Sequence, residues 1–129
     1  MLARNVFLGF SAFLWLSYGI FCFLQPSFLE QAAGLVGNSA TAVTEIRAMY
    51  GGLEVGIGAF CAVALVRSSL VRPALLMLCF LLSGLAGARL AGLVLDGSAS
   101  GYTLGALGFE IASAVIALVL VQRRPETLA

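Results

Sequence analysis

The sequence contains no lysine and no histidine, and only 10% of its 129 residues are charged. An ordinary soluble domain has about a quarter of its residues charged. The lack of histidine excludes histidine-ligated metal and haem sites and the histidine-dependent catalytic triads. A net charge of +1 provides no field that would attract a nucleic acid. We therefore expect no metal, no cofactor and no nucleic-acid partner.

Apolar residues dominate what is present. They make up 61% of the chain, and the mean hydropathy is +1.07. A membrane-spanning helix needs about 20 mostly apolar residues. The first candidate stretch is longer than the core of a signal peptide and lacks a small-residue cleavage site, so we expect it to be retained. The sequence predicts one all-α transmembrane domain over residues 1–129, a bundle of helices spanning about 6–24, 42–66, 73–95 and 103–121.

The loop after the first span has a helical pattern of its own. Ser27 and Glu30 have the spacing of a capping box. One face of the segment that they open is apolar, and its residues are Phe28, Leu29, Ala32, Leu35 and Val36. We expect a short interfacial helix over the outer mouth of the bundle, with an irregular loop as the alternative.

The arginines predict the orientation. Loops 25–41 and 96–102, on one side of the predicted membrane, contain no arginine. Positive residues stay on the cytoplasmic side of a membrane. We therefore expect an integral membrane protein with both termini in the cytoplasm, because that side carries Arg4, Arg67, Arg72, Arg123 and Arg124.

Charged side chains also fall inside the predicted spans, where each costs several kcal/mol unless it is paired. The helix rise places Arg47 roughly 8 Å and Glu54 roughly 18 Å below the outer surface. By the same rule, Arg89 lies roughly 9 Å and Glu110 roughly 10 Å deep. Each of these three helices therefore places a charged group in the outer half of the bilayer, so we expect the buried charges to form one cluster there.

Tyrosines reach the same level. Tyr18 lies near the outer end of the first span, and at 3.6 residues per turn Arg47, Tyr50 and Glu54 share one helix face. We expect Arg89 to pair with Glu54, Glu110 or both, since paired charges avoid most of the desolvation cost. The predicted site residues are Tyr18, Arg47, Tyr50, Glu54, Arg89 and Glu110.

The leading interpretation is an outward-opening site for a small polar or lipid-like ligand. The arginines would hold its head, the glutamates would balance the charge and could exchange a proton, and the tyrosines would orient it. The alternative is a structural or accessory membrane subunit whose charge network only fixes helix packing. An enzyme that uses Glu54 and Glu110 as acid and base is the weakest reading, because no nucleophile or metal set accompanies them.

Small residues recur at spacing four within the spans. This pattern lets helix backbones approach closely, and it predicts tight packing inside the bundle or, as the alternative, a homo-oligomer. The runs are Ala48, Gly52 and Gly56, then Gly84, Ala88 and Gly92, then Gly101 and Gly105.

Several of these residues also form a recognisable pattern. The most specific part is the Arg-Ala-x-Tyr-Gly-Gly block at 47–52, framed by Glu45 and Glu54. With Gly87–Leu90, Asp96-Gly97 and Phe109-Glu110, it resembles the integral membrane family called domain of unknown function 4345, over nearly the whole chain. The resemblance implies a four-helix protein of mostly bacterial origin, hence of a bacterial inner membrane, and carries no established activity.

Overall fold

The computed structural model describes residues 1–123, and every regular element in this range is helical. Four helical stretches are long and apolar enough to cross a membrane. They confirm the predicted all-α bundle, with ends a few residues from the expected ones. Arg124, one of the arginines that predict the orientation, lies outside the described residues. The four stretches are Leu2–Leu24, Ala40–Val66, Ser68–Leu95 and Gly101–Gln122.

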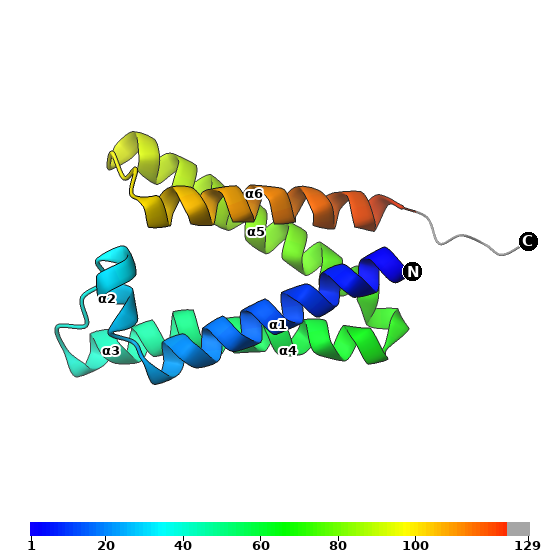
Figure 1. Cartoon of the computed structure of the whole chain (residues 1–129), viewed down its shortest axis with the longest axis horizontal. Coiled ribbons are helices and arrows are strands. Elements are labelled where there is room, and N and C mark those ends of the chain that lie inside the picture. Colours follow the sequence, from blue (N-terminus) through cyan, green and yellow to red (C-terminus); the bar gives the residue numbers. More distant parts are fainter. Residues whose placement is uncertain (124–129) are drawn as a thin grey trace, which may run out of the picture.

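Six α-helices, one π-helical segment and one 3-10 segment occur within residues 1–123 (Figure 1). Helix starts follow from local capping: the hydroxyls of Ser39 and Ser100 each accept a hydrogen bond of 3.1 Å from a backbone N–H three residues on. In chain order the elements are α1 (Leu2–Leu24), α2 (Phe28–Ala33), α3 (Ala40–Ile46), η1 (Arg47–Gly52), α4 (Leu53–Val66), η2 (Ser68–Leu70), α5 (Val71–Leu95) and α6 (Gly101–Gln122).

The short helix expected in the first loop is present as α2, and it ends at Gly34, whose φ of 70° suits a residue without Cβ. The expected capping box is not formed. Ser27 makes no side-chain hydrogen bond to the helix, because its own backbone is helical rather than extended. Helix α2 contacts α6. It therefore lies at the mouth of the bundle, as the apolar stripe predicts.

The long helices associate as two pairs. Helix α1 packs along α4 and η1, and α5 packs along α6. Glycines bring the first pair together, since a Cβ added at Gly58 would lie 2.7 Å from the backbone nitrogen of Leu16. The small-residue runs predicted for this role are not used in that way. A Cβ added at Gly56, Gly84 or Gly105 would meet no atom within 4 Å, so the prediction of tight packing inside the bundle through these runs is wrong.

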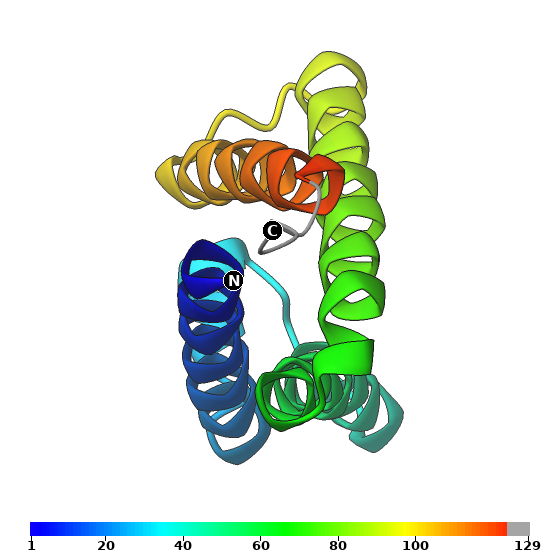
Figure 2. The same cartoon turned by 90° about the vertical axis from the view of Figure 1, so that its right-hand side faces the viewer.

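The two pairs meet at one end of the bundle and diverge at the other. Helix α5 is tilted, so its first turns lie against the α1–α4 pair and its last turns lie far from it (Figures 1 and 2). We call the end with the loops at 25–39 and 96–100 the open end, and the opposite end the termini end. The buried apolar core lies toward the termini end and includes Leu8, Cys61, Leu75, Leu78 and Ala117.

Candidate functional site

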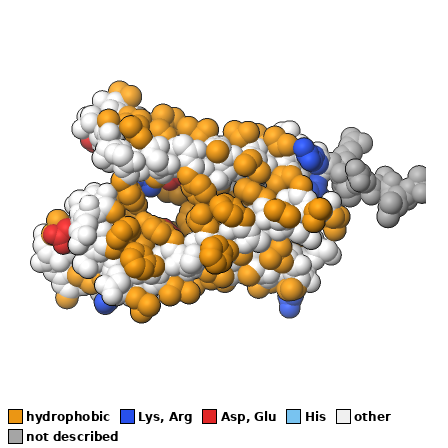
Figure 3. Space-filling model, in the orientation of Figure 1, with side chains coloured by type: hydrophobic (Ala, Val, Ile, Leu, Met, Phe, Trp, Pro, Cys, Tyr) orange, Lys and Arg blue, Asp and Glu red, His pale blue; other side chains and the backbone are white. Residues whose placement is uncertain are grey.

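A cavity of about 680 Å³ lies between the two helix pairs toward the open end. The space-filling view is hollowed there, and acidic and basic side chains are visible inside the hollow (Figure 3). Every long helix contributes to the wall. Most of the wall is apolar, and its polar or charged members are Tyr18, Tyr50, Glu54, Arg89 and Tyr102.

Arg89 forms the charged pair of this region. Its Nε donates to Oε1 of Glu110 over 2.8 Å, and the two side chains are 25% and 6% exposed. The expectation that Arg89 pairs with Glu54, Glu110 or both is thus confirmed for Glu110. Arg89 lines the cavity, whereas Glu110 lies behind it on α6. The guanidinium also lies 5.7 Å from the centre of the Tyr102 ring, within the range of a cation–π contact.

Glu54 has a different environment. It lies on the cavity wall, and its Oε2 is buried without a hydrogen-bond partner among the described residues. Oε2 of Glu110 is also buried without a hydrogen-bond partner among the described residues, although Oε1 of Glu110 bonds to Arg89. An unpaired polar group in an apolar environment is costly. Glu54 is therefore the polar group of the wall that most lacks a partner.

The tyrosines of the wall come from three elements. The hydroxyls of Tyr18 on α1 and Tyr102 on α6 lie 3.3 Å apart and link the two helix pairs. Tyr50 lies on η1 and lines the same cavity. The sequence-based site includes Tyr18 and Tyr50 but misses Tyr102. The sequence does show Tyr102 as an aromatic residue in the first turn of the last span. Aromatic membrane anchors occupy the same position, so this feature alone does not indicate a site residue.

Two predicted site residues do not line the cavity: Glu110, which lies behind it and pairs with Arg89, and Arg47, which lies apart from both. The side chain of Arg47 is exposed, and its Nε donates to the carbonyl oxygen of Phe23 over 3.1 Å. It therefore satisfies a carbonyl in the last turn of α1, a role that suits a cation.

The cause is local helix geometry. Residues 47–52 form a π-helix, and the N–H of Leu53 bonds to the carbonyl of Ala48. A π-turn adds one residue to the helical turn, which shifts the register by about 100° and removes Arg47 from the face of Glu54.

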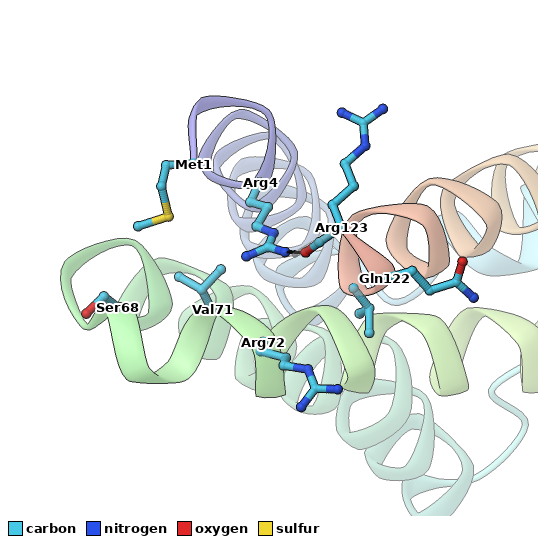
Figure 4. A pocket seen from close by; sticks show the side chains of 8 residues that line it. Met1, Arg4, Ser68, Val71, Arg72, Gln122 and Arg123 are labelled. Carbon is cyan, nitrogen blue, oxygen red and sulfur yellow. Dashed lines mark hydrogen bonds between the residues drawn. The ribbon is translucent and has the colours of Figure 1, made fainter. Parts of the chain in front are cut away.

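A second cavity, of about 670 Å³, lies at the termini end and has three arginines in its wall (Figure 4). Arg4 points inward and donates to the carbonyls of Leu120 and Arg123, so it caps the end of α6. The side chains of Arg72 and Arg123 turn away from Arg4 (Figure 4). Because these guanidinium groups do not converge, the open-end cavity is the stronger candidate site.

These features define an integral membrane protein of four apolar helices, with a largely apolar cavity that contains a few polar groups between its helix pairs. The chain belongs to the family described as domain of unknown function (DUF4345), whose model matches residues 3–121. The four apolar helices indicate a membrane protein, and the family match specifies no activity. Comparison with curated proteins and with solved structures found no match.

Proposed function

We propose that the open-end cavity binds a small lipid-like molecule with a polar head. The observation that carries the proposal is a cavity of about 680 Å³ whose wall contains a carboxyl group with a buried, unpartnered oxygen. Ligand pockets typically enclose about 300–1,000 Å³ and combine an apolar wall with a few polar groups. The head would lie near Tyr18, Tyr50, Glu54 and Arg89, and the apolar part would lie against Leu81, Leu85 and Phe109.

The competing function is a structural subunit whose charges only fix helix packing. The Arg89–Glu110 pair suits that role, since it joins the neighbouring helices α5 and α6. Glu54 does not suit it, because its buried oxygen bonds to no described residue. Two wall glycines, Gly101 and Gly105, leave further space unfilled. A network that served packing alone would gain stability by closing this space, which favours binding.

We further propose a bacterial inner membrane as the location, with both termini in the cytoplasm. The support is the arginine distribution, together with the bacterial origin that the family resemblance implies. In that orientation the cavity lies in the outer half of the bilayer. In intact cells, a cysteine introduced as Ser98→Cys should react with an impermeant thiol reagent, and one introduced as Ser69→Cys should react only after permeabilisation. The reverse pattern would overturn this orientation.

The single tryptophan of the chain, Trp15, lines the cavity and serves as the reporter for binding. We expect a long-chain alcohol with bromine at its chain end to quench Trp15 fluorescence saturably in nanodiscs, because the bromine enters the cavity. Unbrominated alcohol should reverse the quenching by competition.

Two glycines of α6 give a matched pair of variants. Neither Gly105 nor Gly108 has an atom within 4 Å of an added Cβ, but only Gly105 lines the cavity. Gly105→Leu should therefore abolish the saturable quenching, whereas Gly108→Leu should preserve it. If quenching is never saturable, or if both variants behave like the unaltered protein, the proposed binding is wrong and the packing role is favoured.

A further inference from the structure

Five of the 16 residues that line the cavity are aromatic, whereas 10% of the whole chain is aromatic. Trp15 and Tyr18 come from α1, Tyr50 from η1, and Tyr102 and Phe109 from α6. Aromatic faces carry negative potential and attract cations lying within about 6 Å of the ring centre, more strongly when the cation is desolvated. One ring already makes such a contact, since the guanidinium of Arg89 lies 5.7 Å from the centre of Tyr102. The wall thus offers surfaces that are both apolar and favourable to positive charge.

The formal charges of the region also favour a cation. The positive charge of Arg89 is balanced by Glu110 at 2.8 Å. Arg47, the other arginine expected here, lies outside the cavity and binds the end of α1 instead. Glu54 is the wall carboxyl left over, with a buried oxygen that bonds to no described residue. An anionic head would find no unbalanced positive partner on this wall, whereas a cation would find a carboxylate.

We infer that the ligand of the open-end cavity is a lipophilic cation, with its positive charge beside Glu54 and its apolar groups against the aromatic wall. This inference rests on the proposed binding function and specifies its ligand class. It differs from the sequence-based expectation of a polar or lipid-like ligand whose head is held by the arginines. A cation held beside Glu54 would favour the ionised form of its carboxyl group. The resulting ion pair is a contact that a neutral molecule of the same shape would lack.

Two ions of the same shape and opposite charge test the inference. Tetraphenylphosphonium and tetraphenylborate both present four phenyl groups and differ in the sign of their charge. Equilibrium dialysis would measure the uptake of each by the full-length chain in nanodiscs of zwitterionic lipid. Protein-free nanodiscs supply the background for each ion, because the membrane dipole potential makes lipid take up the two ions unequally. We expect protein-dependent, saturable binding of the phosphonium and none of the borate.

Glu54→Gln isolates the carboxylate, and Glu45→Gln is its control, because Glu45 is exposed and does not line the cavity. Loss of the Coulomb attraction between the carboxylate and the phosphonium should weaken phosphonium binding about 10- to 100-fold in Glu54→Gln. Glu45→Gln should leave it unchanged. Glu54→Asp keeps the charge and should retain at least part of the affinity, which separates loss of charge from a general disturbance of the fold.

The possible results distinguish the ligand class from the binding function. Equal binding of the two ions, or phosphonium binding that Glu54→Gln does not alter, would overturn the cation inference. If the brominated alcohol still quenched Trp15 saturably, the proposed binding function would survive that result. Failure of the alcohol and both ions together would overturn both proposals.

Discussion

The two ends of the bundle are built from the same helices and differ in what lies between them. Toward the termini end, Leu75 and Leu78 on α5 are fully buried among residues of α1, α4 and α6. Farther along the same helix, Leu85 is 37% exposed and faces the cavity. The tilt of α5 thus produces close apolar packing at one end and, at the other, a cavity with charged and polar groups in its wall. The difference assigns the closely packed core to the termini end, while the open end contains the cavity for which we propose binding.

The largest loss of stability should come from breaking the Arg89–Glu110 pair. Arg89→Leu would leave Glu110 buried without its partner, and losing one member of a buried pair costs about 3–5 kcal/mol. Reversible unfolding in mixed micelles would measure the loss. Adding Glu110→Gln should recover part of it, because the stranded charge is then removed. A double variant no more stable than Arg89→Leu alone would show that the pair is not buried as described.

Alanine substitutions at two leucines of α5 allow the packing of the two ends to be compared directly. Leu78→Ala removes a fully buried side chain from the core and should lower the free energy of unfolding by about 2–5 kcal/mol. Leu85→Ala only enlarges an existing cavity, so we expect a loss below about 1 kcal/mol. The same unfolding assay measures both. Equal losses at the two positions would mean that the open end is packed as closely as the termini end.

The smallest loss of stability should come from replacing Arg47. Its side chain is exposed and bonds to the carbonyl of Phe23 at the end of α1. Removing a cation from a helix C-terminus costs about 0.3–1 kcal/mol at an exposed site. Arg47→Ala should therefore lower stability slightly and leave the saturable quenching of Trp15 unchanged. Loss of that quenching in a folded variant would mean that Arg47 contributes to ligand binding after all.

The sequence is sufficient to predict the spans, because hydropathy and length determine which segments can cross a bilayer. It also suffices for α2, which the apolar stripe in the first loop predicts. The Arg89 pair is predictable because few groups of opposite charge occur at that depth. The depth argument correctly brings Tyr18, Tyr50, Glu54 and Arg89 to one cavity. These predictions depend on distance along a helix, which the rise per residue fixes.

The predictions that failed depend on how a helix is rotated about its axis and on which helix lies opposite. A regular helix of 3.6 residues per turn gives the wrong face for Arg47, because nothing in the block at 47–52 reveals its π-turn. The glycine spacing likewise does not show which helix lies opposite. Gly19 and Gly58 make the close approaches between α1 and α4, while the glycines of α6 face open space. Trp15 is part of the buried core and also borders the cavity, and the sequence pattern does not reveal this second contact.

Thiol accessibility along α5 tests the difference between the two ends most directly. Leu78→Cys and Leu85→Cys would each be introduced into a chain whose own cysteines, Cys22, Cys61 and Cys79, are replaced by alanine. Each variant would be exposed in nanodiscs to a small water-soluble methanethiosulfonate, with the unfolded protein as the measure of full reaction. We predict that the thiol at position 85 reacts and that the thiol at 78 is protected until unfolding. Equal protection of both thiols in the folded protein would contradict an accessible cavity at the open end.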